Sequence, residues 1–165
     1  MNSIVAEDET WCFRYDPTTK RQSTEWKSPG SPKSKNVRLQ KSKVKTMLVC
    51  FYDSKGIIQH EFVPEGQTVT RSFYLRVLEL LLERIRRVRP EYSAPGSWFL
   101  LHDSAPVHRA DAVQEFLARK QVCGFHHPPY SPDLSPCDYF LFPKLKLPLK
   151  GRLFEDVQDS QAAVT

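Results

Sequence analysis

Three acidic residues occupy positions where a strand-like segment gives way to a loop or a helix. Asp8 lies in the first strand-like region, Asp103 ends the apolar stretch WFLLHD, and Asp138 opens the last predicted helix. A side chain at the end of such a strand emerges at the carboxyl edge of a sheet, where α/β folds place their ligands. If the three segments are neighbours in one sheet, we expect the three carboxylates to converge.

A cluster of carboxylates is energetically costly unless cations neutralise it. Oxygen ligands of this kind suit Mg²⁺ or Mn²⁺, and two such ions about 3.5–4 Å apart can promote in-line attack on a phosphodiester. Each aspartate taken alone has a simpler explanation, because aspartate often caps a helix or stabilises a turn. Residue type and position therefore leave both interpretations open.

The segments that must position these acids follow the order of three strands, a helix, a strand, a helix, a strand and a helix. Residue type and apolar periodicity predict a first strand region with strand-like residues at 4–5 and 11–15, further strands at 45–52, 57–63, 98–101 and 121–125, and helices at 71–89, at 109–120 and from about 138. Thr70 is the predicted N-cap of the first helix, and Pro90 ends it. An antiparallel hairpin followed by α/β crossovers implies an α/β fold with a mixed sheet and helices on both faces.

Positive charge is concentrated in one segment. The whole chain has a net charge of +5, but ten basic and only two acidic residues lie between Arg14 and Lys45. This segment contains the turn-rich stretch SPGSPKSK, and it is either a solvated surface loop or a basic arm that binds phosphates. Trp11 and Trp26 could stack on bases, although an aromatic residue in a strand more often belongs to the core.

The remaining composition excludes some classes of protein. The longest apolar runs are shorter than the roughly 20 residues that span a bilayer, and no secretory leader is recognisable, so we expect neither a membrane association nor disulfides. Cys123 and His126 lie near His127 and Cys137, but their spacing does not match a common zinc finger.

Four stretches of the sequence resemble mariner-family DNA transposases, and together they extend the resemblance over essentially the whole chain. They are DETW from Asp8, KRQSTEWKSPGSPK from Lys20, HDSAPVH around Asp103, and HPPYSPDLSPCDYFLFPKLK from His127. Thirty-four residues lie between Asp103 and Asp138, which is the interval between the second and third catalytic acids of that family. The resemblance matches the first catalytic acid to Asp8.

The resemblance implies a ribonuclease H-like fold, in which a mixed five-stranded sheet is flanked by helices. It implies one catalytic domain over residues 1–165, without the family's N-terminal helix-turn-helix domain and truncated at the C-terminus. The implied activity is metal-dependent phosphodiester hydrolysis and strand transfer into TA sites, with two Mg²⁺ or Mn²⁺ ions held by Asp8, Asp103 and Asp138 and no organic cofactor. The alternative is an inactive or domesticated DNA-binding remnant of a transposon.

Two acids compete for the third position, and the resemblance selects Asp138 over Asp133, which we interpret as a turn residue. The chain also departs from the family pattern beside each catalytic acid. Glu7 replaces the usual glycine, Ser104 replaces an asparagine, and Cys137 replaces a serine. We expect Glu7 to add negative charge beside the site and Ser104 to lose an amide hydrogen bond.

The basic segment at about residues 26–44 resembles the family's clamp loop, which contacts DNA and the partner subunit. The predicted DNA contacts are Lys33, Lys35, Arg38, Lys41 and Lys43. The resemblance therefore implies transposon ends and TA target sites as DNA partners, a homodimer for the full-length protein, and the nucleus as its compartment.

Overall fold

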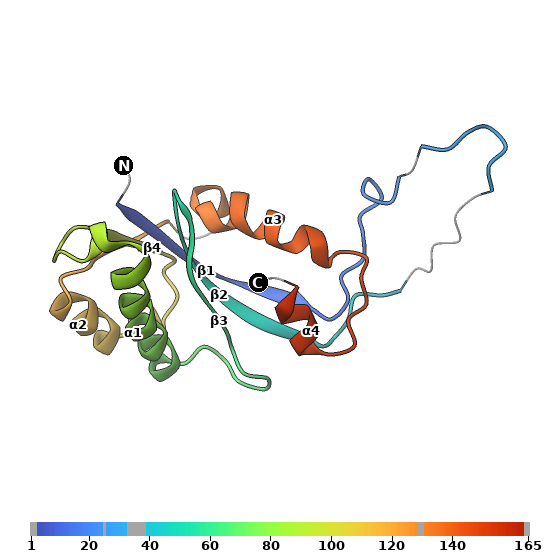
Figure 1. The fold of residues 1–165 in the computed structure, drawn as a ribbon. Coiled ribbons are helices and arrows are strands. Elements are labelled where there is room, and N and C mark those ends of the chain that lie inside the picture. The colour runs from blue at the N-terminus through green and yellow to red at the C-terminus, as the bar shows by residue number, and fades with distance from the viewer. Residues whose placement is uncertain (1–2, 25, 33–38, 129–130, 164–165) are drawn as a thin grey trace. The chain divides into compact units, whose positions relative to one another are not determined.

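The computed structural model describes residues 3–24, 26–32, 39–128 and 131–163 (Figure 1). Its strands are β1 (Ile4–Phe13), β2 (Lys45–Asp53), β3 (Gly56–Phe62), β4 (Phe99–His102) and β5 (Cys123–His126). Its α-helices are α1 (Arg71–Val88), α2 (Asp111–Arg119), α3 (Phe142–Lys146) and α4 (Val157–Ala162). Shorter helical turns are η1 (Pro90–Tyr92), η2 (Pro132–Leu134), η3 (Cys137–Leu141) and η4 (Leu147–Leu149).

The five strands form one sheet in the order β3-β2-β1-β4-β5. β2 and β3 are antiparallel, as expected for a hairpin, whereas β1, β4 and β5 are parallel to their neighbours in the second half of the sheet. The expected mixed five-stranded sheet is therefore confirmed. Because β1 lies in the middle of the sheet, residues near the N-terminus are brought beside β4, which lies about ninety positions later in the sequence.

The main hydrophobic core lies between the sheet and the helices α1 and α2. The residues that α1 buries recur at helical spacing: Phe73, Tyr74, Val77, Leu78, Leu81 and Ile85. They pack in one cluster with strand residues such as Val5, Phe51 and Leu100. In Figure 1, α1 and α2 lie on one side of the sheet, and the helical turn η3 lies on the other.

The start of α1 depends on the predicted cap, because Thr70 Oγ1 accepts a hydrogen bond from the backbone N–H of Phe73 at 3.3 Å. Thr70→Ala is expected to lower the free energy of unfolding by about 1 kcal/mol, since one N–H at the helix start loses its acceptor. Urea denaturation measures this loss. Thr70→Ser keeps the acceptor and should stay close to wild type, so an equal loss in both variants would contradict the assigned cap.

Two predicted boundaries differ from the structure for local reasons. The first two strand-like segments form one continuous strand, β1, whose ten residues include the polar stretch Glu7–Glu9. α2 begins at Asp111 rather than at Arg109, because Ala110 has an extended backbone with ψ of 137°. The four cysteines, all within the described residues, form no disulfide with one another. Among the described residues, no helix is long and apolar enough to cross a bilayer.

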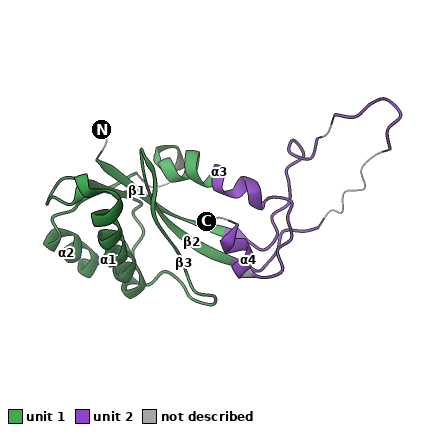
Figure 2. Cartoon of the chain, in the orientation of Figure 1, with its two compact units in different colours: residues 1–11, 46–143 green, residues 12–45, 144–165 purple. Residues whose placement is uncertain are grey.

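The chain divides into two compact units, which Figure 2 shows in different colours. Unit 1 comprises residues 1–11 and 46–143, and it contains the three candidate acids. Unit 2 comprises residues 12–45 and 144–165. Within unit 2, Tyr15 forms an antiparallel bridge with Leu153, and Arg14 Nε donates to the carbonyl oxygen of Phe154 at 2.8 Å. These contacts join the two sequence-distant parts of that unit.

Candidate active site

The three candidate acids lie on β1, directly after β4 and at the start of a helical turn. β1 and β4 pair in parallel as far as Ala6, which lies opposite Leu101. Asp8 and Asp103 each follow that pair by two residues, so continuation of the same register brings them to adjacent positions at the carboxyl edge. Asp138 is the second residue of η3. The middle of β1 therefore supplies one acid, the end of β4 the second, and the helical turn the third.

The pleat of the strands separates these acids from their immediate neighbours, because successive side chains point to opposite faces. Glu7 and His102 point to the face that α1 covers, and they are 1% and 0% exposed. Tyr74 of α1 donates a hydrogen bond from its hydroxyl to Glu7 Oε2 at 3.3 Å. Asp8 and Asp103 are only partly buried. Glu7 is thus packed beneath the sheet, and its carboxyl still interacts electrostatically with Asp8 and Asp103.

Ser135 connects Asp8 to Asp138. Its hydroxyl donates to Asp8 Oδ2 at 2.7 Å and accepts from the backbone N–H of Asp138 at 3.2 Å. Burial raises the pKa of Asp8 to about 6, the hydrogen bond from Ser135 opposes this rise, and the negative charge of Asp138 adds to it. Two acids that are 130 positions apart in the sequence are therefore linked through Ser135, and the charge of one affects the pKa of the other.

Asp103 has a different set of partners. His108 Nδ1 lies 2.7 Å from Asp103 Oδ1, and the backbone N–H of Ala105 donates to the same oxygen at 2.9 Å. The hydrogen bond from His108 is the main reason that the pKa of Asp103 falls to about 2, and burial opposes the decrease. Asp103 is therefore an ionised carboxylate over the whole physiological pH range.

His108 is itself enclosed by acids. Its Nε2 lies 3.3 Å from Glu9 Oε1 and 3.8 Å from Glu7 Oε2. Burial lowers the pKa of His108, but the charge of Glu7, the hydrogen bond with Asp103 and the nearby Glu9 outweigh burial and raise it to about 11. In this state His108 is an imidazolium that holds Asp103 in place.

The donor set of the three aspartates fits divalent cations, because it consists only of carboxylate oxygens. The repulsion between Asp8 and Asp138, which contributes to the high pKa of Asp8, is what a bound cation would relieve. Within the described part of the chain, however, the three aspartates do not form a group whose ligand atoms all lie within 4.8 Å. The group that meets this criterion consists of Glu7, His102 and His108.

Ser135 is the residue of this site that the sequence interpretation missed. Ser135 lies three residues before Asp138, at the start of a helical turn. A capping serine usually accepts a hydrogen bond from the backbone N–H at this spacing. That signal predicts the hydrogen bond to Asp138 but not the one to Asp8, because Asp8 is remote in the sequence.

Ser135→Ala is expected to lower metal-dependent DNA cleavage by about 10- to 100-fold, the usual effect of removing a group that orients a metal ligand. Asp8 loses the hydrogen bond that fixes its carboxylate, while the ligand itself stays. Nicking of supercoiled plasmid, measured over a range of Mn²⁺ concentrations, tests this. Ser131→Ala in the preceding turn is the matched control, and equal effects of the two changes would contradict the role of Ser135.

The structure also describes the two tryptophans and part of the predicted DNA contacts. Trp11 and Trp26 are not core residues, because they are 37% and 103% exposed.

Of the five predicted DNA contacts, Lys33, Lys35 and Arg38 lie outside the described residues. Lys41 and Lys43 are exposed. The Lys41 ammonium lies 3.5 Å from Asp16 Oδ1 and 3.7 Å from the centroid of the Phe13 ring.

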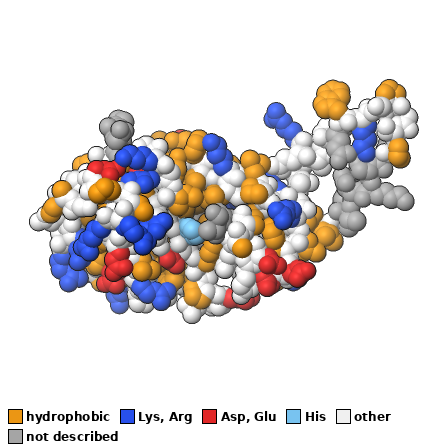
Figure 3. All heavy atoms as spheres, in the orientation of Figure 1, with side chains coloured by type: hydrophobic (Ala, Val, Ile, Leu, Met, Phe, Trp, Pro, Cys, Tyr) orange, Lys and Arg blue, Asp and Glu red, His pale blue; other side chains and the backbone are white. Residues whose placement is uncertain are grey.

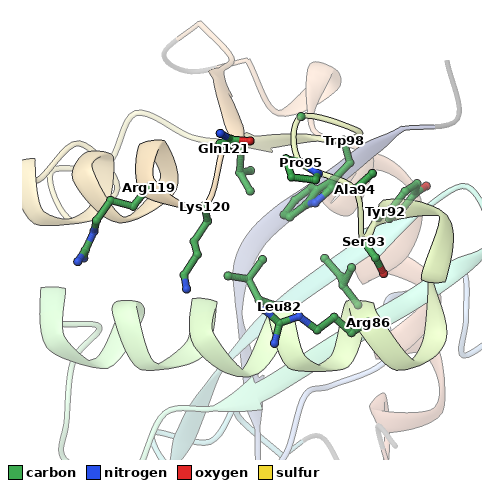
Figure 4. Close-up of a pocket in the computed structure, with 13 residues that line it drawn as sticks. Leu82, Arg86, Tyr92, Ser93, Ala94, Pro95, Trp98, Arg119, Lys120 and Gln121 are labelled. Atoms are coloured by element: carbon green, nitrogen blue, oxygen red, sulfur yellow. The ribbon is translucent and has the colours of Figure 1, made fainter.

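A pocket of about 320 Å³ lies elsewhere in unit 1 (Figure 4). Trp98 and Val122, which line it, directly precede β4 and β5, so the pocket is at the amino end of these strands. Figure 4 shows Lys120 extending from the end of α2 toward α1, where Arg86 also lines the pocket. The space-filling view shows both basic and acidic side chains over the face formed by α1 and α2 (Figure 3). The acids of the candidate site lie at the opposite edge of the sheet.

Comparisons with known proteins agree with this arrangement. A family described as "Transposase (partial DDE domain)" matches residues 16–94. The chain is 34% identical to the Mariner Mos1 transposase of Drosophila mauritiana over 159 residues, which are 96% of this chain and 45% of that protein. A pre-cleavage Mos1 transpososome aligns with a TM-score of 0.82 at 33% identity, over 98% of this chain and 46% of the other. A Mos1 paired end complex with Mn aligns with a TM-score of 0.81 at 34% identity, over the same shares of the two chains.

The sheet order and these alignments define a ribonuclease H-like domain of the kind found in DDE transposases. The chain belongs to the mariner transposase family, and it corresponds in size to a catalytic domain. It spans about half the length of the relatives that it matches.

Proposed function

We propose that this chain is the catalytic core of a cut-and-paste DNA transposase, in which Asp8, Asp103 and Asp138 bind divalent metal ions. The observation that supports this most directly is the hydrogen-bonded bridge from Asp8 through Ser135 to Asp138 at the edge where β4 delivers Asp103. Like charges are brought together there, since the charge of Asp138 contributes to the raised pKa of Asp8. Such an arrangement is typical of a cation site.

Two Mg²⁺ or Mn²⁺ ions bound by these acids would activate water and stabilise charge on the phosphodiester during hydrolysis. The chain's own residues prepare the ligands. Ser135 fixes one oxygen of Asp8, and His108 and the Ala105 N–H fix one oxygen of Asp103. The remaining carboxylate oxygen of Asp103 is then available to a metal ion. No organic cofactor is needed for this reaction.

The proposed substrate is DNA, in the form of transposon ends and TA target sites, and the proposed compartment is the nucleus. Homologous structures of a pre-cleavage transpososome and a paired end complex support a DNA substrate. A homodimer is proposed for the full-length protein, because the basic segment at about residues 26–44 resembles a clamp loop. The enzyme proposal is distinguished from that of an inactive DNA-binding remnant by a cleavage assay.

The assay is nicking of supercoiled plasmid by the purified chain with Mn²⁺, with Mg²⁺ and with EDTA. The proposal predicts open-circular product with either metal and none with EDTA. The new ends should be 3′-hydroxyls that a polymerase can extend, since water attacks the phosphorus, the 3′ oxygen leaves, and the phosphate stays on the 5′ end. Absence of nicking by folded protein that still binds DNA would favour the remnant and overturn the enzyme proposal.

Neutralising the basic segment is expected to weaken DNA binding and to make it less dependent on salt. The five-fold variant replaces Lys33, Lys35, Arg38, Lys41 and Lys43 by alanine. Each phosphate contact that is lost should reduce the slope of log affinity against log salt concentration by about 0.9. Fluorescence anisotropy of labelled duplex DNA between low and moderate salt measures this slope.

The matched control neutralises an equal number of exposed basic residues on the helices that cover the other face: Arg71, Arg76, Arg86, Arg87 and Arg119. This variant has the same net charge as the first. If both variants lose the same slope, general charge rather than the basic segment explains binding, and the predicted contacts are wrong.

A further inference from the structure

A second group of metal-binding side chains lies beneath the candidate active site. Glu7, His102 and His108 are each about 1% exposed or less. Each offers one ligand atom, and these atoms lie within 4.8 Å of one another. Polar atoms buried at this depth normally have a hydrogen-bonding partner.

Several atoms of this group have no hydrogen-bonding partner within the described part of the chain. They are Glu7 Oε1, both ring nitrogens of His102, and His108 Nε2. The ion pair between Glu7 and His108 explains only part of this pattern, because the His102 ring contacts the rings of His108 and His126 but its nitrogens make no hydrogen bond with the described residues. An unpartnered histidine inside a protein core is costly unless something occupies its lone pair.

We propose that Glu7, His102 and His108 form a buried binding site for a transition-metal ion, for which Zn²⁺ is the best match. This site is separate from the Mg²⁺ or Mn²⁺ ligands proposed above, and its existence does not depend on DNA cleavage. Two imidazoles and one carboxylate form a ligand set that suits Zn²⁺, whereas Mg²⁺ prefers oxygen ligands in octahedral geometry.

The distances require a small contraction around the ion. Bonds of about 2.0–2.2 Å in a tetrahedron place ligand atoms roughly 3.4 Å apart. His108 Nε2 is already 3.8 Å from Glu7 Oε2 and 3.3 Å from Glu9 Oε1. We take Glu9 as the candidate for a fourth ligand, because its Oε1 also faces His108 Nε2. The proton on His108 Nε2 leaves for solvent when the metal binds, because imidazole coordinates through an unprotonated nitrogen.

In a zinc site, neighbouring groups hydrogen-bond to the ligands and orient them. Such groups are present here. Tyr74 donates a hydrogen bond to Glu7 Oε2. Asp103 Oδ1 lies 2.7 Å from the other ring nitrogen of His108, which gives a carboxylate–histidine–metal chain. Gly124 leaves room beside His102, since a Cβ there would come within 3.2 Å of His102 Nε2.

One consequence concerns the candidate active site. Asp103 would orient His108 in the buried site while it presents its other oxygen at the edge of the sheet. An ion in the buried site would therefore fix the orientation of Asp103 without contacting DNA.

The test is metal binding by the full chain with Mg²⁺ in excess, so that the aspartates at the sheet edge are occupied. Co²⁺ is added as a spectroscopic probe, and Zn²⁺ is used to displace it. The expected result is one ion per chain, with the visible absorption of tetrahedral Co²⁺ and a higher thermal unfolding midpoint with Zn²⁺. Glu7→Gln and His102→Phe, which keep size and shape, are each expected to lower affinity about 100-fold or more, beyond the 10- to 100-fold effect of losing an outer-shell group.

The matched control is Cys123→Ser, which removes a nearby exposed thiol and should leave affinity unchanged. X-ray absorption of the zinc-loaded wild-type chain provides a readout that needs no variant, and two imidazole ligands without sulfur are expected. The proposal is overturned if the wild type binds no stoichiometric ion, if both single variants retain affinity, if the control loses it, or if sulfur scattering is found.

Discussion

Replacing Asp103 by asparagine is expected to lower the rate of Mn²⁺-dependent plasmid nicking by about a thousandfold or more. Asparagine keeps the size of the side chain but removes the negative charge with which it binds a cation. The loss of transition-state stabilisation should be about 4 kcal/mol, since a ligated metal ion contributes several kcal/mol and each 1.36 kcal/mol changes the rate tenfold. Conversion of supercoiled to open-circular plasmid over time measures the rate.

The control for this change is Asp133→Asn, because Asp133 is an exposed aspartate in η2 and the rejected candidate for the third acid. It should nick DNA at nearly the wild-type rate, whereas Asp138→Asn should resemble Asp103→Asn. Equal activity in Asp103→Asn and wild type, or an equal loss in Asp133→Asn, would contradict the assignment of the acids.

Truncating Arg89 to alanine is expected to destabilise the fold by about 3–5 kcal/mol, because it leaves a buried carboxylate without its counter-ion. Arg89 Nε and Nη2 donate to the two oxygens of Asp53 at 2.7 and 3.0 Å. The Asp53 side chain is 0% exposed, and it also accepts hydrogen bonds from the Lys55 N–H and the Tyr92 hydroxyl. The pair ties the end of β2 to the end of α1.

Equilibrium urea unfolding of the wild type and Arg89→Ala measures this loss. The matched control is Lys55→Ala, which removes an ion pair with Glu91 at the protein surface. Surface pairs contribute little because solvent screens them, so this variant should unfold at nearly the wild-type urea concentration. A similar shift in both variants would mean that burial of Asp53 does not determine the effect.

The same pair predicts how stability depends on pH. Burial alone would raise the pKa of Asp53, but the hydrogen bonds and charge of Arg89, together with the other donors, lower it. The stabilisation is therefore fully present above the unfolded value of about 3.9 and is lost as pH falls through the lower folded value. The difference in stability between wild type and Arg89→Ala should shrink below about pH 4, and a constant difference would contradict this assignment.

The sequence alone predicted the elements whose patterns are local. α1 has a regular apolar face, a capping threonine and a proline after its last residue, so its bounds were predicted within a residue. The hairpin of β2 and β3 follows from two apolar runs around the turn at Asp53–Gly56. The polar residues Glu7–Glu9 interrupted the pattern of β1, because residues at a functional edge do not follow the alternation of a core strand.

What the sequence could not predict depends on contacts between distant segments. The link from Ser135 to Asp8 requires that η3 lies against the end of β1. The burial of Glu7 follows from the register of β1 against β4, since a shift of one residue would exchange Glu7 and Asp8 between the two faces. The identity of the acids came from the resemblance, and the structure adds how two of them are joined.

The location of bound Mn²⁺ tests the central claim most directly. Crystals of the chain soaked with Mn²⁺ would be measured for anomalous scattering, which identifies the ion without reference to activity. We predict anomalous peaks within bonding distance of Asp8, Asp103 and Asp138 at the carboxyl edge of the sheet, and no peak there in Asp103→Asn crystals. Peaks elsewhere, or no peak between these carboxylates in the wild type, would contradict the proposed metal-dependent active site.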